Sequence, residues 1–198
     1  MSQSTHKAGG LNTLATTQDF RNGFAFRMEG NIYIITYFQH VKPGKGSAFV
    51  RTKLKNVQTG AVIERTFKSG DTVDAIRVEN RQMQYIYREG EHYVFMDTET
   101  YEQTHLPHEI VDDSADLMKE NEIVTVLVGD GMPLTVELPN HVDLKIVQTD
   151  PGVRGDTATG GTKPAKVETG AVISVPLFIS EGEMIRIDTR TREYLSRV

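Results

Sequence analysis

The sequence of 198 residues contains no cysteine, which excludes a disulfide framework, a thiolate metal site and a cysteine nucleophile. It also lacks an apolar run close to the roughly 20 residues that cross a bilayer, and its first residues lack the apolar core of a secretory signal. Hydrophobic residues nevertheless make up 38% of the chain and charged residues 25%, a composition typical of folded domains and not of disorder. We therefore expect a soluble intracellular protein that does not bind membranes.

One sign of charge is absent from one stretch and nearly absent from another. Residues 31–63 contain no acid and carry the bases Lys42, Lys45, Arg51, Lys53 and Lys55. Residues 89–122 carry eleven acids and a single base, Lys119. The basic stretch can approach a polyanion such as nucleic acid, whereas the acidic stretch resists non-specific adhesion to one. Plain solvated surfaces would explain both stretches equally well.

Short strands separated by turn residues dominate the pattern along the chain. We predict strands at residues 31–38, 48–56, 61–67, 84–88, 92–97, 122–128, 133–138, 142–148, 172–178 and 184–188. In one of them Val142, Leu144 and Ile146 alternate with more polar residues, as in a sheet with one buried face. A single helix is predicted at 114–120, with Ser114 as its N-cap. This density of short strands predicts an all-β protein of barrels or sandwiches.

The charge pattern also suggests how the chain is divided. Residues 1–15 are small and polar, and we predict that they form a disordered extension or a tag. The basic stretch ends near Arg77 and the acidic stretch near Leu138, which predicts domains at 16–77, 78–139 and 140–198. Each would have about 60 residues, near the lower limit for independent stability. A single elongated sandwich is the alternative.

One lysine lies between glycines in the loop that joins two predicted strands. Pro43 fixes its own φ, and Gly44 and Gly46 tolerate positive φ, so residues 40–47 are predicted to form a tight loop with Lys45 at its end. A lysine in this setting does not contribute to packing. It is either a solubilising turn residue or an amine directed at a distant partner.

The remaining polar motifs are weaker. The glycine- and threonine-rich segment 155–165, with Lys163, offers N–H groups and hydroxyls that suit contacts to phosphate and sugar, although a flexible linker would look the same. His105 and His108 lack further metal ligands at suitable spacing. We therefore expect no metal, no cofactor and no catalytic residue.

Taken together, the motifs resemble bacterial translation elongation factor P from about Gln18 to the C-terminus. The matching blocks are DFRNG at 19–23, FQHVKPGKGSAFVRTKL at 38–54, MQYIY at 83–87, YVFMDTETY at 93–101, TDPGVRGDTATGG at 149–161, TGAVISVPLFI at 169–179 and YLSR at 194–197. The resemblance implies three small β-barrels, an SH3-like (KOW-like) N-terminal domain followed by two OB-folds, in an L-shaped, tRNA-like arrangement.

The resemblance also implies a function. It implies a cytoplasmic, monomeric, non-enzymatic elongation factor that binds the 70S ribosome between the P and E sites, next to the peptidyl-tRNA. There it would stimulate peptide-bond formation and relieve stalling at consecutive prolines. Three further readings stay open: a divergent paralogue of this family, a generic OB-fold RNA-binding protein, and an enzyme that uses Lys45 as a Schiff-base amine.

Individual residues take their roles from the same resemblance. Lys45 is implied to carry a post-translational modification, added by a lysine-modifying enzyme, and to contact the CCA end of the tRNA. The surrounding loop that binds tRNA or rRNA would consist of Lys42, Pro43, Gly44, Gly46 and Arg51. The C-terminal domain would contact RNA, including the exit-site mRNA codon, through Asp156, Thr157, Gly160, Gly161, Tyr194 and Arg197. Because the modified position is lysine, the arginine-rhamnosylated subgroup is disfavoured.

Overall fold

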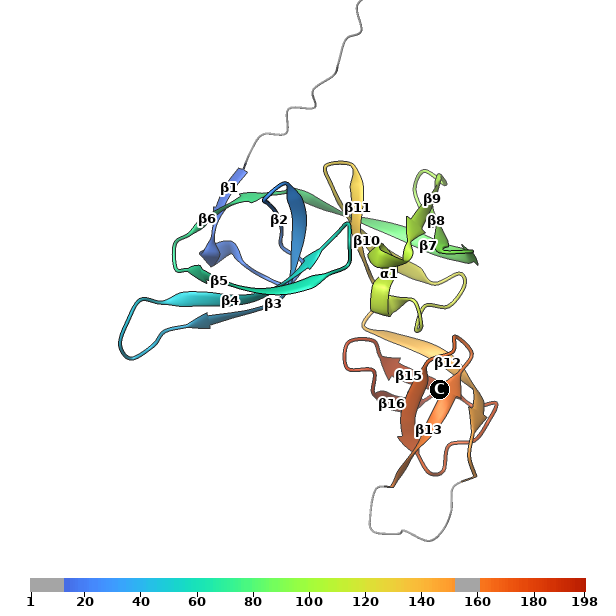
Figure 1. The fold of residues 1–198 in the computed structure, drawn as a ribbon. Helices are drawn as coiled ribbons and strands as arrows, with labels where there is room; N and C mark the ends of the chain where they lie inside the picture. The colour runs from blue at the N-terminus through green and yellow to red at the C-terminus, as the bar shows by residue number, and fades with distance from the viewer. Residues whose placement is uncertain (1–12, 152–160) are drawn as a thin grey trace, which may run out of the picture. The chain divides into compact units, whose positions relative to one another are not determined.

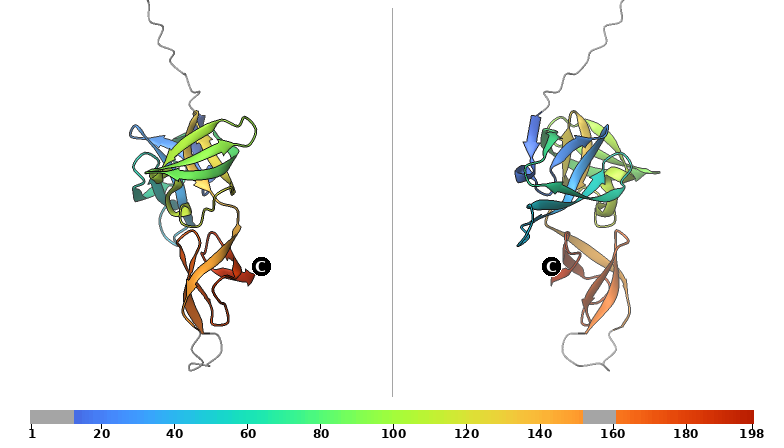
Figure 2. Two further views of the ribbon diagram at one scale, coloured as in Figure 1. Left: turned by 90° about the vertical axis from the view of Figure 1, so that its right-hand side faces the viewer. Right: turned by 60° about the vertical axis from the view of Figure 1, so that its left-hand side comes forward.

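The structure is a computed structural model that describes residues 13–151 and 161–198, with the Asp113 side chain left out. Within these residues nearly all regular structure is β, arranged in three antiparallel sheets that each curl strongly (Figures 1 and 2). The described chain divides into two compact units, one of residues up to Asn80 with Leu127–Thr135, the other of Arg81–Val126 with Val136–Val198. The domain boundaries at residues 77 and 139 stay predictions.

The first sheet has the strand order β1-β6-β2-β3-β4-β5. Its strands are β1 (Thr13–Thr16), β2 (Ala25–Met28), β3 (Asn31–Val41), β4 (Phe49–Asn56), β5 (Val62–Lys68) and β6 (Thr72–Ala75), with the short 3-10 helix η1 at Thr17–Asp19. Its core is aromatic, because the rings of Phe20, Phe67 and Tyr33 lie with centroids 6.0, 6.0 and 6.4 Å from that of the fully buried Phe26. This core holds the base of the β3–β4 hairpin.

The second sheet has the order β11-β10-β7-β8-β9. Its elements are β7 (Val78–Glu89), β8 (His92–Asp97), β9 (Gln103–Pro107), α1 (His108–Val111), the 3-10 helix η2 (Asp112–Ser114), β10 (Ile123–Gly129) and β11 (Met132–Glu137). Tyr85, Tyr93 and Phe95 are buried in it, with ring centroids 5.5 to 6.0 Å apart around Tyr85. Burial raises the pKa of the Tyr85 phenol, and the negative charge of the nearby Glu120 raises it further.

The third sheet has the order β14-β13-β12-β15-β16. It consists of β12 (His141–Thr149), β13 (Thr162–Val167), β14 (Val172–Pro176), β15 (Met184–Asp188) and β16 (Tyr194–Arg197). The predicted alternation is confirmed here, since Val142, Leu144 and Ile146 are all buried in one core. The sheet therefore has one apolar face turned inward and one polar face turned to solvent.

The predicted helix at 114–120 is wrong. The α-helical residues are His108–Val111, and the chain leaves helical geometry at Asp112, whose φ is +50°. Ser114 does not cap a helix, because its hydroxyl donates to the carbonyl oxygen of Val136 at 3.3 Å. Leu117 is drawn instead into the core of the third sheet. Burial of this one leucine outweighs the weak local helix signal.

The predicted extension also ends too late. Thr13–Thr16 forms β1 and pairs antiparallel with β6, from Thr13 opposite Ala75 to Thr16 opposite Thr72. Ala15 is half-buried against the aromatic core of the first sheet. Strand partners so far apart in the sequence leave no local signal, which is why residues 13–15 look like part of a polar extension.

Acid is expected to weaken one cross-strand pair in the third sheet. Arg186 on β15 donates two hydrogen bonds of 2.8 Å to the Asp143 carboxylate opposite it on β12, and these bonds hold the pKa of Asp143 below its usual range. A carboxylate with a lowered folded-state pKa stabilises the fold above its ordinary pKa, and this contribution is lost as the pH falls. Replacing Asp143 with asparagine should therefore lower the unfolding free energy by up to about 1 kcal/mol near neutral pH and by less near pH 3.

Urea unfolding at the two pH values measures this difference. Glu137→Gln is the matched control, because Glu137 is an exposed acid with no ion pair in the part of the chain that the structure describes. Equal destabilisation by Asp143→Asn at both pH values would show that packing, and not the carboxylate charge, carries the effect.

Candidate nucleic-acid interface

The lysine loop, predicted at residues 40–47, lies at residues 42–48 between β3 and β4. Lys42, Pro43, Gly44, Lys45 and Gly46 are all exposed, and no residue that the structure describes makes a hydrogen bond or ion pair with the Lys45 amine. Gly46 has φ +106°, a conformation that requires glycine. Gly44 does not have positive φ, and a Cβ there would meet nothing within 4 Å. The lysine is therefore presented to solvent by a turn that depends on Gly46.

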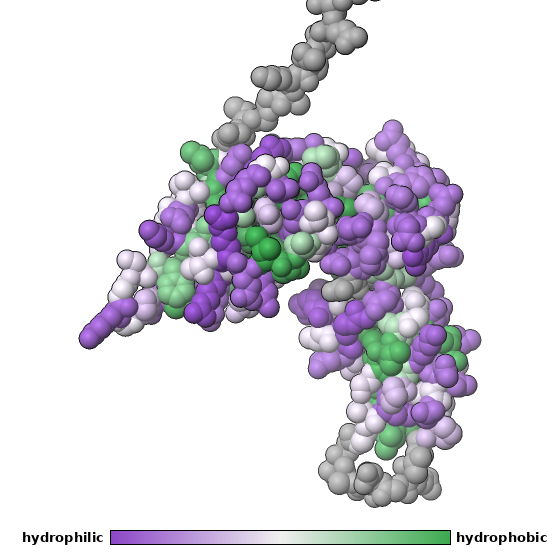
Figure 3. Space-filling model, viewed as in Figure 1, coloured by the Kyte–Doolittle hydropathy of each residue, from purple (hydrophilic) through white to green (hydrophobic). Residues whose placement is uncertain are grey.

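A three-stranded extension carries this loop. On β3, only Asn31–Ile34 pair with the short strand β2. Beyond Ile35, β3 therefore has β4 as its sole strand partner in the described sheet. β4 in turn pairs with β5 from Phe49 to Lys55. Figure 1 shows the β3–β4 hairpin running past the rest of the first sheet, and Figure 3 shows hydrophilic atoms at its end. The amine is thus positioned by a loop that hydrogen-bonded strands hold on both sides.

A β-bulge decides which side chains face outward on this extension. Ile35 pairs with Leu54 but Tyr37 pairs with Lys53, so Thr36 is the extra residue, and its hydroxyl donates to the Lys53 carbonyl oxygen at 3.2 Å. Phe38 therefore packs against the aromatic core while Tyr37 points away from it. The strand pattern of the sequence contained no sign of this bulge.

The outward face holds a groove of about 530 Å³. Its lining includes residues from all three strands of the extension: Tyr37, Gln39, Arg51, Lys53, Glu64 and Thr66. The Arg51 guanidinium lies 5.6 Å from the centroid of the Phe49 ring and makes no ion pair within residues 13–151 and 161–198. The Lys53 amine nitrogen lies 3.8 Å from Oε1 of the exposed Glu64. Lys55 is buried, so four of the five bases of the stretch 31–63 remain to meet a polyanion.

The C-terminal site residues are placed only in part. Asp156, Thr157 and Gly160 lie outside the described residues, whereas Gly161 is exposed beside the start of β13. Arg197 is exposed and its guanidinium donates to Glu183 at 3.1 Å. The pKa of Glu183 is lowered mainly by the Ser180 N–H, which donates to its carboxylate, and to a smaller extent by Arg197.

Tyr194 is half-buried and packs against the core of the third sheet. The resemblance implied an RNA contact for this ring, and the structure adds a packing role that only tertiary contacts reveal. The exposed charge on β16 is therefore carried by Arg197.

Lys163 has an internal role. It occupies a core-facing position of β13, only 8% of it is exposed, and its amine donates to the Asp150 carbonyl oxygen at 2.7 Å. Thr149 adds a second tie, donating its hydroxyl to the Pro164 carbonyl oxygen at 3.0 Å. These bonds join the ends of β12 and β13, so the Lys163 amine is not exposed for the phosphate contacts expected of the segment 155–165.

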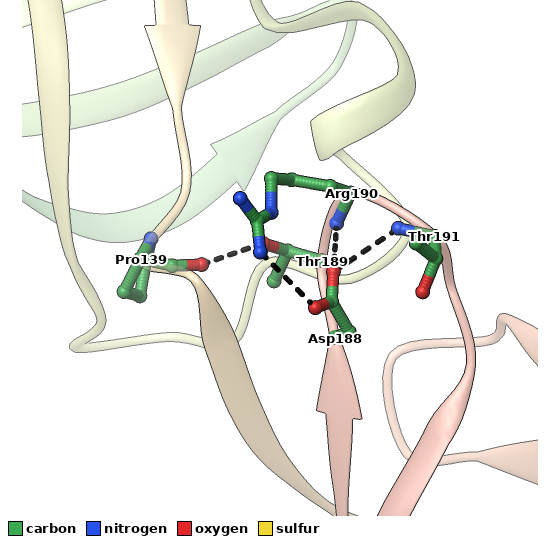
Figure 4. A network of polar contacts seen from close by, with 5 residues as sticks. All are labelled: Pro139, Asp188, Thr189, Arg190 and Thr191. Atoms are coloured by element: carbon green, nitrogen blue, oxygen red, sulfur yellow. Dashed lines mark hydrogen bonds and ion pairs between the residues drawn. The ribbon is translucent and has the colours of Figure 1, made fainter.

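A further network joins the turn after β15 to the segment that enters β12 (Figure 4). The Thr189 hydroxyl donates to the Pro139 carbonyl oxygen at 2.6 Å, and Asp188 accepts from the N–H groups of Arg190 and Thr191 at 2.8 and 3.1 Å. The N–H of Thr191, followed by that of Arg190, lowers the pKa of Asp188. The network fixes the backbone from which the exposed Arg190 side chain extends.

The Nε2 atom of His105 lies 3.3 Å from Oε2 of Glu89, and among the residues with described positions no group of three or more His, Asp or Glu side chains could hold a metal ion. Within the same residues no helix is long and apolar enough to cross a membrane.

Comparison with known proteins identifies the family. Three family models match in order: Elongation factor P (EF-P) KOW-like domain at residues 16–73, Elongation factor P (EF-P) OB domain at 78–136, and Elongation factor P, C-terminal at 142–197. The chain belongs to the elongation factor P family. The prediction of an all-β protein with KOW-like and OB domains is confirmed.

Curated relatives agree with this assignment. An elongation factor P of Moorella thermoacetica is 56% identical over 184 residues, covering 93% of this chain and all of the relative. An elongation factor P of a Thermoanaerobacter species is 58% identical over 180 residues, covering 91% and 97%. Among solved structures, a eukaryotic translation initiation factor 5A from Methanococcus jannaschii has a TM-score of 0.46 and 20% identity, over 63% of this chain and 93% of that one. The elongation factor P family is a family of translation factors.

Proposed function

We propose that this protein binds the ribosome beside the peptidyl-tRNA, between the P and E sites, and stimulates peptide-bond formation where consecutive prolines stall it. The observation that carries the proposal is the Lys45 amine, exposed at the end of a paired hairpin and free of any partner in the described chain. Family membership supports a role in translation.

The physical reason is positioning. Proline is a poor peptidyl donor and acceptor because its ring restricts its geometry. A factor that holds the CCA end of the tRNA in place can recover rate without exchanging protons, because correct placement alone removes a large part of a barrier. Lys45, with Lys42 and Arg51 nearby in sequence, would contact the phosphate backbone of that end electrostatically. In this proposal the chain supplies no catalytic group and no cofactor.

A Schiff-base role for Lys45 is less well supported. A lysine nucleophile needs a lowered pKa, which desolvation or a nearby cation provides. Lys45 is exposed between two exposed glycines. The same exposure suits the proposed modification, because a lysine-modifying enzyme can reach the amine without unfolding the chain.

We extend the proposal to the third sheet. Gly161 and Arg197 lie on exposed positions there, and with Asp156, Thr157 and Gly160 they would contact RNA, including the exit-site mRNA codon. Tyr194 would take part through the portion of its ring that the core leaves exposed.

Reconstituted translation tests the proposal. A message that encodes three consecutive prolines should stall without the protein, and the purified protein should restore full-length product. A message of equal length without consecutive prolines should be unaffected, which controls for general stimulation. Tight binding to free oligonucleotides with no effect on the stall would favour a generic RNA-binding protein. Relief at a different stalling motif alone would favour a divergent paralogue.

A further inference from the structure

The groove on the outward face of β3, β4 and β5 is lined by none of residues 42–48, although it includes Arg51, which was predicted to act together with the Lys45 loop. Its side chains form cross-strand rows, in which Tyr37 lies opposite Lys53, and Gln39 lies opposite Arg51. Thr66 extends the second row from β5. Because residues two apart on a strand are roughly 7 Å apart on the same face, Arg51 and Lys53 form a pair of cations spaced along the groove.

An exposed aromatic ring stands beside these cations. Tyr37 is 47% exposed, although the core of this sheet is built from aromatic residues and receives the neighbouring Phe38. The bulge at Thr36 is what places Tyr37 on the outward face and Phe38 on the core face. The ring therefore does not serve the core of the sheet and is available to a ligand.

The charges of the groove favour an anion. Arg51 has no acidic partner among the described residues, and Lys53 has only the solvent-exposed Glu64 at 3.8 Å, an exposed ion pair that contributes little. Gln39 and Thr66 add neutral hydrogen-bonding groups. A protein partner would call for a larger apolar centre, since the buried core of such interfaces is apolar and depleted in charge.

We propose that this groove binds single-stranded RNA, with one base stacked on Tyr37 and the phosphates of adjacent nucleotides at Arg51 and Lys53. An exposed aromatic ring between spaced cations is the arrangement by which proteins bind unpaired nucleotides. A duplex would leave the ring unused, because its bases are already stacked on one another. The proposal rests on the proposed function for the source of the strand, which is the unpaired 3′ end of a tRNA bound by Lys45.

The test measures binding of the full chain to a short fluorescent single-stranded RNA ending in CCA. Tyr37→Leu should weaken binding by about 5- to 150-fold, the range found when a stacking ring is lost, while Tyr37→Phe should bind as the wild type does. Arg51→Gln and Lys53→Gln should each reduce the slope of log K against log salt by about 0.7. Lys166→Gln, at an exposed lysine of the third sheet, is the matched control and should leave affinity and slope close to wild type.

Several outcomes would overturn the inference. They are equal affinity of Tyr37→Leu and wild type, equal binding of the single strand and of its annealed duplex, or a loss with Lys166→Gln as large as with Lys53→Gln. Unchanged thermal unfolding of Tyr37→Leu shows that any loss is local. If stall relief depends on the protein but RNA binding is indifferent to Tyr37, the proposed function stands and the groove assignment falls. If Tyr37 controls RNA binding but the protein relieves no stall, the groove assignment stands and the proposed function falls.

Discussion

Lys45→Ala is expected to abolish relief of a triple-proline stall in reconstituted translation while leaving the fold intact. The amine has no contact partner among the described residues, so its removal takes away no interaction that holds the chain together. Thermal unfolding should therefore agree with wild type to within about 0.5 kcal/mol, as for other exposed sites. The yield of full-length product from the stalling message measures the loss.

Two further variants make this result specific. Lys45→Arg keeps the positive charge but cannot carry a lysine modification, so partial relief would separate charge from modification. Lys166→Ala removes an exposed lysine from the third sheet and should relieve the stall as wild type does. Full relief by Lys45→Ala would remove this residue from the proposed role.

Phe26→Ala is expected to cause a large loss of stability in the first sheet. The ring is fully buried and has four aromatic neighbours: Phe20, Phe24, Tyr33 and Phe67. Truncation of such a buried ring lowers the unfolding free energy by about 3–5 kcal/mol, because the transfer energy of the ring is lost and a cavity remains. Since the chain has no tryptophan, urea unfolding is best followed by far-UV circular dichroism.

The chain contains a matched control for this prediction. Phe178 is 68% exposed, and Phe178→Ala should change the unfolding free energy by less than about 0.5 kcal/mol. Phe26→Leu retains much of the side-chain volume and serves if Phe26→Ala does not fold. It should lower the unfolding free energy by more than Phe178→Ala does. A loss with Phe178→Ala as large as with Phe26→Ala would contradict the burial argument.

The sequence predicted those elements whose signal is local. β12 shows a two-residue alternation of apolar and polar residues, and β8 at His92–Asp97 was predicted with its observed ends. β1 and β6 are only four residues long and have partners about sixty positions away in the sequence, so no local pattern marks them. β14 ends at Pro176, two residues before its predicted end.

The candidate site shows the same division between local and tertiary information. Exposure of Lys45 followed from its glycine neighbours and was confirmed. Lys55 was counted in the basic stretch and Lys163 in the segment suited to phosphate contacts, but both side chains are buried, and such burial is rare for lysine. The outward position of Tyr37 depends on a single extra residue opposite β4, which no composition or periodicity argument locates.

The extra residue Thr36 therefore changes which side chains of β3 face the core. Upstream of it the odd-numbered residues Tyr33 and Ile35 turn inward, and downstream the odd-numbered Tyr37 and Gln39 turn outward. If the pairing ran on without the bulge, Thr36 would lie opposite Lys53, Tyr37 would turn inward and Phe38 would turn outward, so the two faces of the outer hairpin would be exchanged. When this chain is aligned with a relative, a gap misplaced by one position would assign the ring to the wrong face. Spacing along this strand thus encodes orientation as well as length.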